Sequence, residues 1–208
     1  MKKVILIWGM LLVLVLAACG DIDEKNSREV TPKGDVAGEA QAGEGDKQEE
    51  EKEKPVGTRS NPLPFGDTIT VKENIYDDSS NAYESNLDIT LLETIRGEEA
   101  WAIIKGENMY NEPATDGFEY VLIKVKGFLK ESETDDDSLY FSDMNFNFVT
   151  NEGEVLEFIS VVIPNGLSKE LFNGATGEGF LVNQVKTGDD FKVSYDSSEG
   201  SPIFFSVQ

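Results

Sequence analysis

The side chains that most enzymes use for proton transfer and nucleophilic attack are almost missing from this sequence. Its 208 residues include no histidine and one cysteine, Cys19. Histidine is the commonest general base and metal ligand, and it completes the usual serine and cysteine triads. A single cysteine forms no intramolecular disulfide and no multi-thiolate zinc site. We therefore predict a non-catalytic protein and assign no catalytic residue.

Carboxylates are the reactive side chains that the sequence does supply. It has 40 Asp and Glu against 18 Lys and Arg, a formal net charge of −22. The densest run is Glu131-Ser132-Glu133-Thr134-Asp135-Asp136-Asp137. Calcium takes carboxylate oxygens from acidic loops, so one hypothesis is a calcium site made by Glu133, Asp135, Asp136 and Asp137. The other is a solvated, repulsive loop, because the spacing differs from that of an Asp-x-Asp-x-Asp-Gly calcium loop.

Two carboxylates are also enough to hydrolyse a glycosidic bond. The sequence places no such pair on a strand end beside an aromatic sugar platform, and Trp101 falls on an expected helix, where we predict a core position. A carboxylate-based hydrolase is therefore a remote alternative. The negative charge disfavours nucleic acid as a partner and favours cations or basic partners.

The N-terminal residues predict export. Lys2 and Lys3 precede an apolar run, residues 4–16, that is too short for a comfortable bilayer span. Leu16-Ala17-Ala18-Cys19 closes this run and resembles the lipobox of bacterial lipoproteins. In that family the cysteine thiol receives a diacylglyceryl group, and the chain is cut before it. The resemblance implies a signal peptide over residues 1–18, cleavage between Ala18 and Cys19, and lipid attachment at Cys19.

Such an anchor would hold the protein on the extracytoplasmic face of a bacterial cell membrane. Each buried CH₂ contributes about 0.8 kcal/mol, and a single acyl chain holds a protein only marginally. Two acyl chains of the palmitate class would give stable attachment without a transmembrane helix. The alternative is an ordinary signal peptide followed by a coincidental cysteine.

Residues 19–60 have the composition of a spacer. They are rich in Glu, Asp, Lys, Gly and Ala, contain no aromatic residue and have few β-branched ones. Such a segment buries too little apolar surface to offset the entropy of ordering it. We therefore predict a disordered acidic tether, roughly 35 Å in root-mean-square length. A charged recognition tail is the alternative.

Residues 61–208 are long enough for one domain with its own core. Apolar residues recur there mostly with period two, which predicts strands. A helix is expected over residues 98–105 and a helical turn over 167–172. Short strands separated by turn residues such as Asn151-Glu152-Gly153 favour an all-β sandwich. The expected strands cover residues 66–78, 87–95, 118–129, 141–150, 155–163, 179–185, 191–195 and 203–207.

Several stretches of this domain resemble a known family. The set is similar to an uncharacterised family of immunoglobulin-like lipoprotein domains from Gram-positive bacteria, which is itself similar in fold to a secreted mycobacterial immunoprotective antigen. The resemblance implies an immunoglobulin-like β-sandwich of about eight strands with one short helix, and it brings no catalytic residues. It rests on residues 58–66 (Thr-Arg-Ser-Asn-Pro-Leu-Pro-Phe-Gly), residues 117–125 (Gly-Phe-Glu-Tyr-Val-Leu-Ile-Lys-Val), a Phe-x-Phe-Val strand before Glu152-Gly153, and Gly177-Glu178-Gly179-Phe180.

Together these features predict a membrane-anchored lipoprotein that acts outside the cell as a non-catalytic binding or accessory module. The lipid on Cys19 would join it to the membrane, and its partner would be a protein, a peptide or a cell-wall component. The alternative is a lipoprotein that binds calcium or a basic ligand through its acidic loops. No other cofactor is expected.

Overall fold

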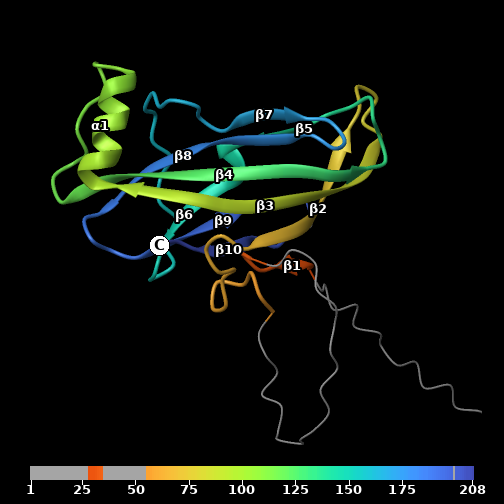
Figure 1. The fold of residues 1–208 in the computed structure, drawn as a ribbon, viewed down its shortest axis with the longest axis horizontal. Helices are drawn as coiled ribbons and strands as arrows, with labels where there is room; N and C mark the ends of the chain where they lie inside the picture. Colours follow the sequence, from red (N-terminus) through yellow and green to blue (C-terminus); the bar gives the residue numbers. More distant parts are fainter. Residues whose placement is uncertain (1–27, 35–54, 199) are drawn as a thin grey trace, which may run out of the picture.

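Two β-sheets that pack face to face make up most of the protein. The computed structural model describes residues 28–34, 55–198 and 200–208 (Figure 1). Its strands are β1 (Val30–Thr31), β2 (Thr68–Tyr76), β3 (Ala82–Arg96), β4 (Phe118–Ser132), β5 (Leu139–Ser142), β6 (Phe146–Thr150), β7 (Ser168–Leu171), β8 (Thr176–Lys186), β9 (Phe191–Tyr195) and β10 (Ile203–Ser206), with helix α1 (Gly97–Glu107) and a 3₁₀ turn, η1 (Asp143–Asn145). The prediction of an all-β sandwich is confirmed.

The larger sheet has the order β1-β2-β3-β4-β8, and the smaller one has the order β10-β9-β6. A two-stranded ribbon of β5 and β7 accompanies them. All pairings between these strands are antiparallel. β2, β3 and β4 follow one another as a meander, so the larger sheet shares the sandwich architecture of antibody domains without their A-B-E-D strand order.

β4 is the central strand of the larger sheet, between β3 and β8. Val121, Ile123 and Val125 are fully buried in the main core, which the smaller sheet completes. Tyr120 and Leu122 belong to a second apolar cluster that includes α1. Because both faces of the strand are covered, its first half is apolar at nearly every position, as its sequence predicts.

Aromatic rings from the smaller sheet fill the main core. Phe146 lies with its ring centroid 4.9 Å from that of Tyr195, and Phe148 stacks on Phe191 at 5.5 Å. Phe141, from β5, meets Phe146 edge-on at 5.7 Å. Large rings of this kind contribute strongly to the energetics of a core, and here they pack among the aliphatic side chains of the larger sheet.

Helix α1 covers the opposite face of the larger sheet, beside β3 and β4 (Figure 1). Ala100 and Ile104 are fully buried, four residues apart on one face. Gly97 starts the helix at φ +63°, a conformation that favours glycine. The helix predicted over residues 98–105 is thus confirmed and is slightly longer.

Glycines let the β5–β7 ribbon approach the larger sheet. A Cβ on Gly179 would lie 2.6 Å from the backbone Cα of Leu167, and one on Gly127 would lie 2.6 Å from the Phe141 ring. Gly177, the register partner of Gly127, faces Leu171 of β7 in the same way. The Gly177-Glu178-Gly179 motif is therefore a close-packing site.

The strand predicted over residues 155–163 is wrong. Beyond an isolated bridge between Val149 and Val155, this segment is irregular and lies over the second apolar cluster. A side chain replaces the missing strand partner: Asn111 Nδ2 donates to the carbonyl of Val162 at 2.7 Å, and the amide of Val162 donates to Asn111 Oδ1 at 3.1 Å.

Two neighbouring predictions also need correction. The helical turn expected over residues 167–172 is strand β7, which pairs with β5. The single strand expected over residues 141–150 is two strands separated by η1. Ser142 and Asn145 close that turn with reciprocal hydrogen bonds, which breaks the strand.

Part of the expected tether, on the N-terminal side of the predicted boundary at residue 60, contacts the sandwich. Val30 and Thr31 form a strand on β2, and the Gly57 carbonyl accepts a hydrogen bond from the Phe204 amide at 2.8 Å. Leu63 is fully buried and lies parallel to Phe205 in β10. The described residues include no helix long and apolar enough to cross a membrane.

Candidate functional site

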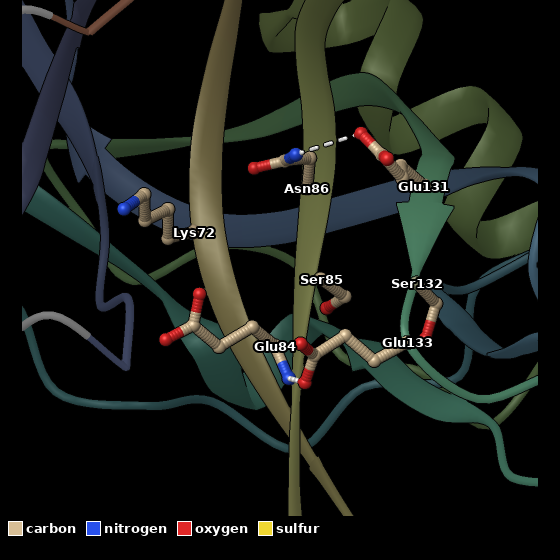
Figure 2. A pocket seen from close by; sticks show the side chains of 7 residues that line it. All are labelled: Lys72, Glu84, Ser85, Asn86, Glu131, Ser132 and Glu133. Carbon is tan, nitrogen blue, oxygen red and sulfur yellow. Dashed lines mark hydrogen bonds between the residues drawn. The ribbon is translucent and has the colours of Figure 1, made fainter.

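A polar cavity is lined by residues of β2, β3 and β4 (Figure 2). In Figure 1 these three strands lie side by side at the end of the sheet that is far from α1. The volume of the cavity is about 320 Å³. We call it the acidic cavity; it is lined by Lys72, Glu84, Ser85, Asn86, Glu131, Ser132 and Glu133. Three glutamates and one lysine therefore line a single space.

The strand register produces this arrangement. Lys72 of β2 pairs with Asn86 of β3, and Asn86 pairs with Glu131 of β4, so the three side chains form one row across the sheet. A register shift follows at once, between Asn86 and Leu87. Irregularities of this kind re-aim side chains and are common beside functional sites.

Hydrogen bonds fix two of the carboxylates. Asn86 Nδ2 donates to Glu131 Oε2 at 3.3 Å, and the amide of Glu84 donates to Glu133 Oε2 at 2.9 Å. The amide of Glu133 returns a bond to the Glu84 carbonyl at 3.0 Å. Figure 2 shows the Lys72 ammonium directed away from Glu131. Glu131 and Glu133 are thus held in place by neutral donors.

Of the four residues predicted to bind calcium, only Glu133 is among the residues that line this cavity. Glu133 lines it, whereas Asp135 accepts a hydrogen bond from Asn173 at 2.7 Å and Asp137 accepts one from Thr134 at 2.9 Å. The amide of Asp136 donates to Thr134 Oγ1 at 3.2 Å. Within residues 28–34, 55–198 and 200–208, no three acidic, cysteine or histidine side chains are grouped so that they could hold a metal.

The residues predicted to carry the lipid lie elsewhere in the chain. Ala18, Cys19 and the whole signal peptide, residues 1–18, fall outside the described residues. The cavity residues that sequence reasoning missed are Lys72, Glu84, Ser85 and Asn86. The period-two alternation of strand residues could have indicated them. In β2, for example, it puts Lys72 on the solvent face, because its neighbours Val71 and Glu73 are buried.

A buried carboxylate, Glu73, points to the other face of β2. It is 5% exposed and accepts hydrogen bonds from the Tyr195 hydroxyl at 2.8 Å and the Ser198 amide at 3.1 Å. The Ser198 hydroxyl donates to it as well. Burial, with the Glu73 charge adding to it, raises the pKa of Tyr195 well above its ordinary value. This cluster ties β2 to β9 and the residues that follow it.

A second cavity, of about 440 Å³, lies at the start of α1. Trp101 is half-buried there, so the predicted core position is only part of its role, and its ring stacks on Tyr120 at 5.8 Å. Glu119 accepts a hydrogen bond from Arg96 at 2.7 Å and one from the Gly188 amide at 3.0 Å. We call this the aromatic cavity; its lining includes Glu98, Trp101, Phe118, Glu119 and Tyr120.

Comparison with known proteins gives one distant likeness. No protein-family model and no curated protein matches the chain. A crystal structure from Bacillus subtilis, described as that of a "putative lipoprotein (ycdA)", matches with a TM-score of 0.40 and 9% sequence identity. The match covers 67% of this chain and 38% of the Bacillus chain. The chain therefore spans well under half the length of that protein, and the likeness establishes no family.

Proposed function

We propose that the protein is a lipid-anchored, extracytoplasmic binding module without catalytic activity. The observation that carries this proposal is Leu16-Ala17-Ala18-Cys19 directly after the apolar run of residues 4–16. The folded part supports it with a β-sandwich whose surface is hollowed by polar and aromatic cavities. The chain's lack of histidine disfavours most acid–base and nucleophilic mechanisms.

Replacing Cys19 tests the anchor. In bacteria fed an alkyne analogue of palmitate, the wild-type protein should take up the label and sediment with membranes. Cys19→Ala should lose the label and either stay uncleaved or appear in the medium. A Cys19→Ala, Ser201→Cys double variant, which moves the thiol into the domain, should also stay unlabelled. Labelled, membrane-bound Cys19→Ala protein would contradict the anchor.

The acidic cavity supports a basic group as the ligand. Residues 61–208 carry 28 acidic and 9 basic side chains, a net charge of −19, so the domain attracts cations from a distance. Within the cavity, Glu84, Glu131 and Glu133 outnumber Lys72. We propose a lysine- or arginine-bearing peptide, or an amine-bearing cell-wall component, as the ligand class.

Matched charge variants test this site. Trilysine titrated at low salt should shift the amide signals of Asn86 and Glu131 in an NMR spectrum. Glu84→Gln with Glu131→Gln should weaken binding at least fivefold, because two of the three carboxylates lose their charge. Glu99→Gln with Glu107→Gln makes the same charge change on exposed positions of α1 and should bind like wild type. Equal losses in both would show net charge alone and refute the cavity.

Calcium is a second candidate ligand, raised by the acidic run of residues 131–137, although the described residues group no three carboxylates that could hold a metal. Calorimetry should then show heat on addition of CaCl₂ to metal-free protein, with a rise in melting temperature. MgCl₂ at the same concentration is the control for ionic strength. No heat and an unchanged melting temperature would remove the calcium candidate.

The aromatic cavity bears on the hydrolase alternative, because it brings two carboxylates beside three aromatic rings. Burial tends to raise the pKa of Glu119, but the Gly188 amide and Arg96 outweigh it and hold the pKa below its ordinary value. A general acid needs a raised pKa instead. We therefore expect no turnover of aryl glycosides; turnover that Glu98→Gln abolishes would refute the non-catalytic proposal.

A further inference from the structure

Residues 28–34 cover the outer edge of β2. Val30 pairs with Ile69 and Thr31 with Thr68, and the amide of Thr70 donates to the Glu29 carbonyl at 2.9 Å. β2 would otherwise be the edge of the larger sheet. An uncovered edge presents a row of amide and carbonyl groups that can pair with another chain.

Contacts on several elements hold this segment in place. Val30 is half-buried against the main core. Lys130 of β4 forms an ion pair with Glu29 at 3.3 Å, and Arg28 donates to the carbonyl of Ser201 at 3.3 Å. The amide of Lys33 donates to Asp67 at 2.8 Å. The segment therefore contacts the sheet, the core and a residue just before the C-terminal strand.

We propose that the β2 edge is a docking site for residues 28–34 of the same chain, and that docking sets how far the domain stands from the membrane. This inference rests on the proposed lipid anchor at Cys19. When the segment is docked, residues 20–27 separate it from Cys19. At about 3.3–3.6 Å per residue, that chain reaches roughly 30 Å.

Release of the segment lengthens the tether several-fold. Among the residues that the structure describes, the next backbone hydrogen bond from the chain to a strand of the sandwich is at Gly57, so the greatest reach becomes roughly 130 Å at the same rise per residue. The paired strand is only two residues long, and Pro32 has no amide to extend it. A short strand on an edge can be displaced by another extended segment. Displacement of residues 28–34 from the β2 edge would let the domain move further from the membrane.

Two aspartate variants separate docking from charge. Val30→Asp puts a carboxylate where a half-buried methyl group packs, whereas Thr31→Asp adds the same charge at an exposed position of the same strand. We expect the Thr70 amide to exchange with deuterium at least tenfold faster in Val30→Asp and within threefold of wild type in Thr31→Asp. Amides in β4 should keep wild-type protection in both, which verifies the fold.

Energy transfer then reports the distance in membranes. Because acylation consumes the thiol of Cys19, Ser201→Cys gives one labelling site on the full-length lipidated protein in phosphatidylcholine vesicles containing an acceptor lipid. Transfer from the label should fall by at least half in Val30→Asp and should change little in Thr31→Asp.

The two proposals fail in different ways. If the anchor is wrong, no variant binds the vesicles, although Thr70 is still protected in wild type. If docking is wrong, vesicle binding persists and Val30→Asp leaves both Thr70 exchange and energy transfer unchanged. Equal effects of the two aspartates would also overturn docking, because charge alone would then explain them.

Discussion

Among single residues, Glu73 is a buried carboxylate that depends on hydrogen bonds from distant residues. A buried carboxylate is tolerated only when hydrogen bonds satisfy it. Tyr195 and Ser198 provide donors, and both are more than 120 positions away in the sequence. The pattern of alternation places Glu73 on the core face with Ile69, Val71 and Ile75. That position could have been read from the sequence, but its partners could not, because nothing local links β2 to β9.

Tyr195→Phe should lower the free energy of unfolding by about 1–3 kcal/mol, because Glu73 loses one donor while it stays buried. Urea unfolding followed by tryptophan fluorescence measures this. Tyr140→Phe is the matched control, since the Tyr140 hydroxyl bonds Ser168 at the exposed surface and its loss should cost under about 0.5 kcal/mol. Equal losses of unfolding free energy in the two variants would show that the hydrogen bond to Glu73 does not add to stability.

Glu119 should make stability depend on pH in the acid range. Its pKa in the folded protein lies below its ordinary value of 4.5, so its contribution is present above that pH and is lost as pH falls through the folded-state pKa. Glu119→Gln should therefore cost about 1–2 kcal/mol at pH 7 and progressively less below pH 4.5. Urea midpoints at pH 7 and pH 3 measure this, and a difference that is independent of pH would contradict it.

At the scale of elements, glycine positions decide how closely the β5–β7 ribbon can lie against β8. Gly179→Ala places a methyl group against the Leu167 backbone, which has no flexible atoms to move aside. We expect a loss of about 1–3 kcal/mol, the usual cost of overpacking. Gly106→Ala meets nothing within 4 Å in α1 and should stabilise by about 0.5–1 kcal/mol. Melting temperatures that move in the same direction would contradict this account.

Elements with a strong local pattern could be predicted, and those that depend on distant partners could not. β9 is found where its alternation places it, and α1 differs by one or two residues. The segment 155–163 also looks like a strand, yet Asn111 satisfies the backbone of Val162 and the chain packs over α1's cluster instead. β1 has one apolar residue among polar ones, so its sequence carries almost no strand signal.

For the molecule as a whole, charge is the dominant long-range term. A net charge of −22 destabilises a compact state through self-repulsion, and salt screens it. The melting temperature should therefore rise by several degrees as NaCl increases from 10 to about 300 mM. Differential scanning calorimetry at constant pH measures this, and a fall with salt would show that favourable ion pairs outweigh the repulsion.

The acidic cavity could be predicted from the sequence only in part. The sandwich follows from strand periodicity, and Glu131 and Glu133 stand out in the acidic run. The cavity also needs Glu84 and Lys72, which only the β2-β3-β4 register brings to them. The alternation of a strand is visible in its own residues, whereas register depends on the geometry of the whole meander.

The parallel contact between Leu63 and β10 gives the domain a mechanical property. The Leu63 amide donates to Phe204, its carbonyl accepts from the Ser206 amide, and Gly57 accepts from Phe204. These bonds run across the chain direction, so a pull on the N-terminal end against the C-terminal strand loads them together, in shear. β1 lies outside this set of hydrogen bonds and would separate from β2 first. Force applied through the proposed anchor would thus separate β1 from β2 at low force, while the sandwich beyond Leu63 stays folded.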